Sequence, residues 1–214
     1  MSLLAYVSGH GFGHWTRCEA VLEPLAQEFP IHVRTCGRAL PAAKRRATWA
    51  ASVEAFDTGP GVAQKGPLEI DLPATRAALE AHLDAWPDLI EAGVADAARS
   101  GARGVFADVP PLAFEIARAA SLPSLGMANF TWSWTYEHYA ALDPFFGEAS
   151  ARLATAEGLA GGLIALPGGG GLERVGDASP TLALRRSPTR SREAARALLP
   201  VPADDPRPRV LLSF

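Results

Sequence analysis

The hexapeptide Gly-His-Gly-Phe-Gly-His, residues 9–14, joins two stretches of contrasting pattern and decides the fold. Before it, the apolar run Leu-Leu-Ala-Tyr-Val-Ser at 3–8 predicts a short buried strand. After it, the apolar residues fall on one face of a helix: Cys18, Val21, Leu22, Leu25 and Phe29. Residues 31–36 read as a second strand. Strand, glycine-rich turn, helix and strand form a βαβ unit, which predicts an α/β domain.

The glycines of this turn allow a tight bend and let a ligand approach the backbone, beside a helix N-terminus that favours anions. A dinucleotide site needs Gly-x-Gly-x-x-Gly and an acid after the second strand, but here the third glycine comes one residue early and the strand ends in Thr35-Cys36-Gly37. No Gly-Lys-Ser/Thr follows, so the turn is not a nucleoside triphosphate loop. His10 and His14 as metal ligands, and a plain turn with a solvated histidine, remain alternatives.

The composition of the chain narrows the possible classes of function but does not identify one. The chain has 214 residues, 48% of them hydrophobic, with a net charge of −3, so no bulk charge favours nucleic acid or an anionic membrane. Its two cysteines, Cys18 and Cys36, do not form a disulfide framework and fit a reducing compartment. We see neither a signal peptide nor an apolar run of membrane-spanning length, and therefore expect a cytoplasmic protein.

Further along, apolar runs alternate with helical patterns. This predicts one mainly parallel sheet with helices on both faces, and its expected strands are 3–8, 31–35, 52–56, 103–107, 123–127 and 162–166. Turn formers predict a mobile surface loop at 57–72 and a flexible glycine loop at 168–171. Residues 1–199 are the expected domain, 200–208 a proline-rich linker, and 209–214 the first strand of a further, truncated domain.

Two more segments follow predicted strands at the edge where α/β sheets bind ligands. Asp108 closes the fourth strand, and its carboxylate could act in a site, cap the next helix, or do both. Residues 129–136, Asn-Phe-Thr-Trp-Ser-Trp-Thr-Tyr, follow the fifth strand. These aromatic side chains could stack on sugar or base rings, or plug the space between a helix and the sheet.

Four motifs in order resemble the N-terminal half of a GT-B glycosyltransferase, a fold of two facing Rossmann-like domains. The most similar group is the glycosyltransferase-like N-terminal module of L-arabinokinases, with related bacterial stand-alone proteins. Their Tyr-Val-x-Gly-His-Gly-Phe-Gly-His-x-Thr-Arg stands at 6–17, and their Ser/Ala-Asp-Val-x-Pro at 107–111. Asn-Phe-Ser/Thr-Trp-Asp/Ser stands at 129–133 and Leu-Pro-Gly at 166–168, so the resemblance covers nearly the whole chain.

The resemblance implies the acceptor-side Rossmann-like domain of an inverting transferase. Such an enzyme moves a hexose-type sugar from a nucleotide-diphosphate sugar, its co-substrate, to a hydroxyl of a sugar or glycoside acceptor. His14 matches the general base and Asp108 the carboxylate that orients it, with no metal and no other cofactor. The donor would be held mainly by the C-terminal domain that this chain lacks. The alternatives are a non-catalytic sugar-recognition module of the kind fused to sugar kinases and, more weakly, a nucleotide-binding oxidoreductase.

The substrate contacts implied by the same motifs come from the glycine turn, the first helix and the aromatic segment. They are Gly9, His10, Gly11, Phe12, Gly13, Arg17, Asn129, Phe130, Thr131 and Trp132.

Overall fold

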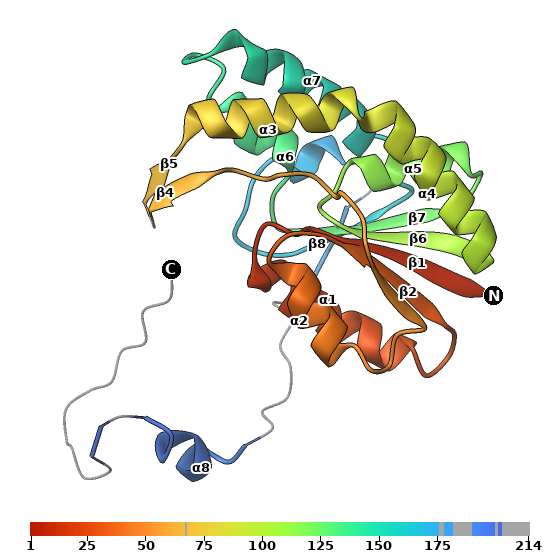
Figure 1. Ribbon diagram of the computed structural model, residues 1–214, viewed down its shortest axis with the longest axis vertical. Coiled ribbons are helices and arrows are strands. Elements are labelled where there is room, and N and C mark those ends of the chain that lie inside the picture. Colours follow the sequence, from red (N-terminus) through yellow and green to blue (C-terminus); the bar gives the residue numbers. More distant parts are fainter. Residues whose placement is uncertain (67, 176–177, 182–189, 200, 203–214) are drawn as a thin grey trace. The chain divides into compact units, whose positions relative to one another are not determined.

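The computed structural model describes residues 1–66, 68–175, 178–181, 190–199 and 201–202. The chain divides into two units, residues 1–184 and 185–214, and each is described by itself. The first unit holds the sheet and nearly all the helices (Figure 1). In the second, the described residues form one short helix, α8 (Arg192–Arg196), capped by the Ser191 hydroxyl. Of the predicted linker only residues 201 and 202 are described, and the strand predicted at 209–214 lies outside the described residues.

The main sheet of the described residues has seven strands, and every neighbouring pair is parallel. In spatial order they are β3 (Ser52–Ala55), β2 (Ile31–Thr35), β1 (Ser2–Val7), β6 (Ala102–Asp108), β7 (Ser124–Ala128), β8 (Leu163–Ala165) and β9 (Ala178–Pro180). All six predicted strands are present, which confirms the expected parallel α/β sheet. The sequence did not predict β9, a short edge strand without an apolar run.

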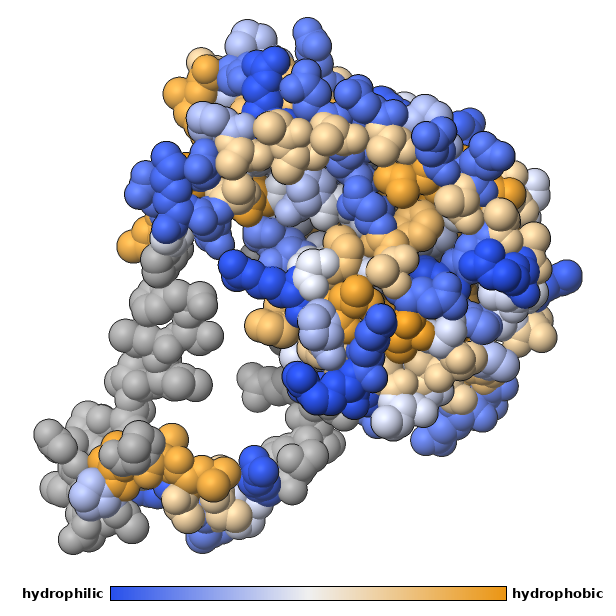
Figure 2. All heavy atoms as spheres, viewed as in Figure 1, coloured by the Kyte–Doolittle hydropathy of each residue, from blue (hydrophilic) through white to orange (hydrophobic). Residues whose placement is uncertain are grey.

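Helices cover both faces of this sheet (Figure 1). One face carries α1 (Phe12–Leu25) and α2 (Ala39–Arg46). The other carries α3 (Leu72–Asp84), α4 (Trp86–Ser100), α5 (Leu112–Ala119), α6 (Trp132–Glu137) and α7 (Pro144–Glu157). On the face shown in Figure 2, hydrophobic and hydrophilic residues are interspersed over these helices. Among the described residues, every helix is too short or too polar to cross a lipid bilayer.

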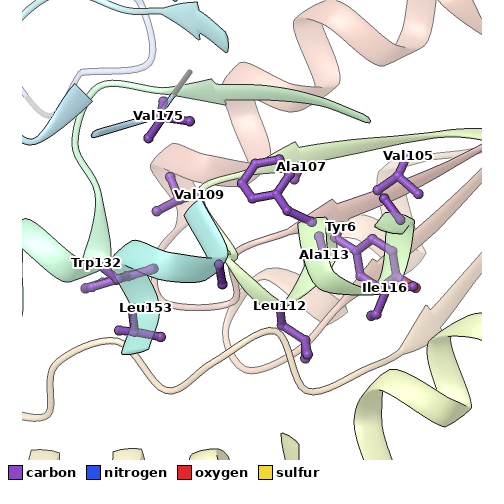
Figure 3. Packing of buried hydrophobic residues seen from close by; sticks show 14 of the residues in the cluster. Tyr6, Val105, Ala107, Val109, Leu112, Ala113, Ile116, Trp132, Leu153 and Val175 are labelled. Carbon is purple, nitrogen blue, oxygen red and sulfur yellow. The ribbon is translucent and has the colours of Figure 1, made fainter. Parts of the chain in front are cut away.

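Strand β1 shows how the sequence pattern builds two cores. Successive side chains of a strand point to opposite faces, so Leu4 and Tyr6 join one buried cluster while Ala5 and Val7 join the other. All four are essentially inaccessible to solvent, as expected for a strand buried on both faces. Figure 3 shows Tyr6 beside Ile116 and Ala113 of α5, within the cluster that fills the α5 face of the sheet.

The segment predicted as a mobile loop at 57–72 contains regular structure. Gln64–Gly66 (β4) and Glu69–Ile70 (β5) pair as an antiparallel hairpin, and Asp71 caps α3 by accepting a hydrogen bond from the Ala74 amide. Strands of three and two residues are too short to show an alternating pattern, and the turn formers around them favoured a loop.

Candidate functional site

The strand order places the candidate site. From β1 the chain proceeds outward to β2 and β3 on one side, then returns to β6 and continues to β7 and β8 on the other. The carboxyl ends of β1 and β6 therefore form the switch point at which open α/β sheets bind ligands. Val7 at the end of β1 pairs with Asp108 at the end of β6, so the glycine turn and Asp108 meet there.

His14 and Asp108 lie in contact at this switch point. The Nδ1 atom of His14 is 3.4 Å from Oδ1 of Asp108. Asp108 is fully buried and His14 is 7% exposed. Within the described part of the chain, the other ring nitrogen, Nε2, has no hydrogen-bond partner. A ring held at Nδ1 with Nε2 unengaged is the arrangement that a general base requires.

Arg17 joins three segments at the same point. Its Nε donates to Oδ2 of Asp108 at 2.8 Å, and its Nη2 donates to Oδ1. Its Nη1 donates to Oδ1 of Asn129 at 2.6 Å, which ties the loop after β7 to helix α1. The Nη2 atom also lies 3.0 Å from Nδ1 of His14, closer than Asp108 does. These two partners require opposite roles of Nδ1. Toward Asp108, whose carboxylate only accepts hydrogen bonds, Nδ1 must be a donor; toward Arg17, whose guanidinium only donates them, Nδ1 must be an acceptor.

The charges in this cluster are mutually compensated. Burial raises the pKa of the Asp108 carboxyl, but the hydrogen bonds from Arg17 and His14 outweigh burial and hold that pKa below its ordinary value. Burial together with the Asp108 carboxylate raises the pKa of the Cys18 thiol well above its ordinary value, so Cys18 stays a thiol and donates to Oδ2 at 2.9 Å. Asp108 is therefore an ionised carboxylate with both oxygens engaged.

Asp108 does not cap the helix that follows it. The N-cap residue of α5 is Pro111, which makes no side-chain cap hydrogen bond, and both carboxylate oxygens of Asp108 face α1 instead. Val109, the next residue, has a φ angle of +75°, a left-handed conformation that is strained for a β-branched side chain. Backbone strain of this kind is common at functional sites.

The glycines of the turn have different roles. A Cβ at Gly9 would lie 2.5 Å from the carbonyl oxygen of Cys36, so Gly9 is required for the packing of two loops. At Gly11 and Gly13 a Cβ would meet nothing within 4 Å. Phe12, between them, is 58% exposed. The first turn of α1 therefore presents an open surface beside His14, with no side chain capping it.

In the aromatic segment after β7, some side chains contact the histidine rings and others are buried. The Phe130 ring lies 5.8 Å from the His14 ring, and the Trp132 ring lies 5.2 Å from Phe130 and 5.4 Å from His10. Trp132 is buried, and its ring is also stacked on Tyr136. Thr131 is buried as the N-cap of α6, accepting from the Trp134 amide. The four rings thus form a row from His14 to His10.

The glycine run at 168–171 is a closely packed part of this site, and the flexible loop expected from the sequence is not what the structure shows. A Cβ at Gly169 would fall 1.1 Å from the carbonyl oxygen of Asn129, and one at Gly170 would fall 2.4 Å from the Trp134 ring. The Thr131 amide donates to the Gly170 carbonyl at 3.2 Å. The run therefore packs its backbone directly on residues 129–134.

Metal ligation by His10 and His14 receives no support from the geometry. The two rings contact different members of the aromatic row, Trp132 and Phe130. In the ranges that the structure describes, no group of three or more histidine, cysteine, aspartate or glutamate side chains is placed to hold a metal ion.

Some residues of the site were missed by sequence reasoning. Cys18 is four residues from His14 on the same helix face, a spacing that could have indicated its contact with Asp108. Arg38, Pro60 and residues 62–64 approach the turn from other segments and line a cavity with Gly9 and His10. No local pattern in the sequence marks those two segments.

The chain matches no protein-family model and no curated protein in sequence. Its fold is similar to solved glycosyltransferase structures. MurG of Acinetobacter baumannii aligns over 84% of this chain and 45% of its own, with a TM-score of 0.50 and 14% identity. A UDP-glucosyltransferase from Polygonum tinctorium, capable of glucosylating indoxyl, aligns over 91% of this chain and 55% of its own, with a TM-score of 0.53 and 13% identity.

A third structure, UGT2 of Phytolacca americana, aligns over 87% of this chain and 54% of its own, with a TM-score of 0.55 and 11% identity. The chain spans about half the length of these proteins. The similarity shows the fold of the N-terminal half of a GT-B glycosyltransferase.

Proposed function

We propose that this chain is the acceptor-side domain of an inverting GT-B glycosyltransferase. In this proposal a nucleotide-diphosphate sugar donates a hexose-type sugar to a hydroxyl of a sugar or glycoside acceptor. The observation that carries it is the contact of 3.4 Å between His14 and Asp108 at the switch point of the sheet, with Nε2 of His14 unengaged.

A sugar hydroxyl is a weak nucleophile until its proton is accepted, and histidine titrates near neutral pH. In the proposed reaction, Nε2 of His14 accepts that proton as the hydroxyl oxygen attacks the anomeric carbon of the donor and the nucleotide diphosphate leaves. Asp108 accepts from Nδ1–H, which selects the tautomer with a free Nε2 and stabilises the imidazolium that forms. Attack opposite the leaving group inverts the anomeric carbon.

One observation favours a second candidate function, a non-catalytic sugar-recognition module like those that precede sugar kinases such as L-arabinokinases. Nη2 of Arg17 lies 3.0 Å from Nδ1 of His14, nearer than Asp108. If Nδ1 accepts from Arg17, the ring proton sits on Nε2, and His14 donates a hydrogen bond to a ligand instead of taking a proton.

Two substitutions of His14 separate these functions, tested in the intact protein that contains the donor-binding domain. His14→Ala removes the ring, whereas His14→Gln keeps a hydrogen-bonding amide without a basic nitrogen. For the transferase, we expect both to lower turnover by roughly 10²–10⁴-fold, the scale of general-base catalysis. The control is His138→Ala, an exposed histidine of the loop after α6. Wild-type turnover in a folded His14→Ala variant would refute the assigned base, and sugar binding without any turnover would support the recognition module.

A further inference from the structure

A cavity of about 220 Å³ lies at the His10 end of the aromatic row, and His14 is not among the residues that line it. Three segments line it: the turn after β1, with Gly9 and His10; the turn after β2, with Gly37 and Arg38; and the segment that holds Pro60 and residues 62–64. Its volume is below the roughly 300–1,000 Å³ typical of drug-sized sites and equals about seven water volumes. This is room for one small ring and its substituents.

Close backbone approaches hold these walls together. Gly37 has a φ angle of +51°, and a Cβ there would lie 2.9 Å from the Gly9 carbonyl oxygen, which also accepts from the Arg38 amide at 3.2 Å. Gly61 has a φ angle of +66°, and a Cβ there would lie 2.4 Å from Nδ1 of His10. Tyr136 anchors the same segment, donating to the Gly61 carbonyl at 2.7 Å. The cavity is therefore preformed, which lowers the entropic cost of binding.

The lining carries one guanidinium, that of Arg38, and combines the polar side chains of His10 and Gln64 with three apolar ones, those of Pro60, Val62 and Ala63. Arg38 is exposed and makes no ion pair with any acid that the structure describes. Among the described residues, no acidic side chain lines the cavity. Burial lowers the pKa of His10, and the neighbouring His14 and Arg38 side chains lower it further, so His10 is neutral at pH 7 and offers a hydrogen bond without adding charge. Gln64 adds an amide. One unpaired guanidinium among neutral side chains, polar and apolar, suits a ligand with one anionic group.

The aromatic row relates the cavity to His14. His10 lines the cavity and contacts Trp132, Trp132 contacts Phe130, and Phe130 contacts the His14 ring. We infer that the cavity binds an anionic monosaccharide unit of the acceptor, a sugar acid or a sugar phosphate, with Arg38 as the counterion of its carboxylate or phosphate. The role of this ligand as acceptor rests on the proposed function, whereas its binding to the cavity does not.

Calorimetric titration of the 214-residue chain tests the inference without any turnover. The probes are glucose, glucuronate, glucose 6-phosphate and inorganic phosphate. We expect one of the two anionic sugars to bind at least tenfold more tightly than glucose and than inorganic phosphate, with affinity falling as salt is added. Whether glucuronate or glucose 6-phosphate binds more tightly identifies the anionic group.

Arg38→Gln should reduce the affinity for the preferred anionic sugar about tenfold, equivalent to about 1.4 kcal/mol. Arg45→Gln is the matched control, because Arg45, on α2, is exposed like Arg38 but does not line the cavity. Equal affinity for glucose and the anionic sugars, inorganic phosphate binding as tightly as the sugars, no binding by any probe, or full affinity in Arg38→Gln would each overturn the inference. Anionic sugar binding without transfer in the intact protein would refute the proposed function alone.

Discussion

Replacing Asp108 by alanine removes the group on which the candidate site converges. Its carboxylate accepts hydrogen bonds from Arg17 on both oxygens and from the Cys18 thiol, and it lies 3.4 Å from the His14 ring. The substitution leaves the Arg17 guanidinium without its acid. Removing one member of a buried ion pair costs about 3–5 kcal/mol, because the remaining charge is uncompensated.

The exposure of the two partners refines this range. The Arg17 side chain is 15% exposed and can move toward water, whereas the Asp108 side chain is 0% exposed and cannot. We therefore expect Asp108→Ala to lower the free energy of unfolding by about 3 kcal/mol, near the lower limit. For a chain of this length, that corresponds to a fall of roughly 6–12 °C in Tm. Arg17→Gln, which leaves the inaccessible carboxylate unpaired, should cost more, about 5 kcal/mol.

The loss of stability in Asp108→Ala should become smaller as the pH falls. Because the pKa of Asp108 is lower in the folded chain than its ordinary value of about 3.9, its stabilising contribution is complete above pH 4 to 5. That contribution is lost as the pH falls through the folded-state pKa. The difference in stability between the wild type and Asp108→Ala should therefore be largest near neutral pH and shrink below about pH 4.

Urea denaturation of the 214-residue chain, followed by circular dichroism, measures these differences. The control is Glu91→Gln, an exposed acid in the middle of α4, for which we expect a change within about 0.5 kcal/mol. The double variant of Arg17→Gln and Asp108→Ala should cost at least about 1 kcal/mol less than the sum of the single variants. A loss below about 1 kcal/mol for Asp108→Ala, or strict additivity, would show that the ion pair does not hold the site together.

Three further predictions follow from the loops of the site. Gly169→Ala should cost about 3 kcal/mol or more in urea denaturation, since its Cβ would overlap the Asn129 carbonyl, whereas Gly168→Ala, at φ +82° in open space, should cost roughly 1–2 kcal/mol. Gly11→Val should leave stability within about 0.5 kcal/mol, because Gly11 is extended and its Cβ meets no neighbour, yet, on the proposed function, lower turnover in the intact protein by covering the open turn. Uridine and guanosine diphosphates should bind the 214-residue chain more weakly than about 1 μM in calorimetry; tighter binding, about −8 kcal/mol or stronger, contradicts the acceptor-side assignment.

The sheet was predictable because its strands are continuous apolar runs. Strands buried on both faces, such as β1 and β6, are apolar at nearly every position and do not alternate between apolar and polar residues. Glycine and proline residues mark where they end. The missed strands lack this signal. Strand β9 reads Ala-Ser-Pro at the sheet edge, where a proline is tolerated, and β4 and β5 contain three and two residues.

The glycine run at 168–171 could not be predicted correctly for a different reason. A glycine-rich sequence is equally compatible with two kinds of loop. One kind is flexible, and in the other the backbone packs closely against another backbone. Gly169 belongs to the second kind because Asn129 lies where its side chain would be. That neighbour is forty positions away in the sequence, so only the folded chain distinguishes the two cases.

Some contacts of Arg17 follow from local helical spacing, and others follow from the strand order of the sheet. One helical turn places Arg17 beside His14, so their proximity follows from the i, i+3 relation alone. Its partners Asp108 and Asn129 are 91 and 112 residues away, and they reach it only because β6 lies beside β1 and β7 beside β6. No residue pattern within β6 states which strand will be its neighbour. The roles assigned to His14 and Asp108 therefore came from family resemblance, whereas the ion pair of Arg17 with Asp108 follows only from the strand order.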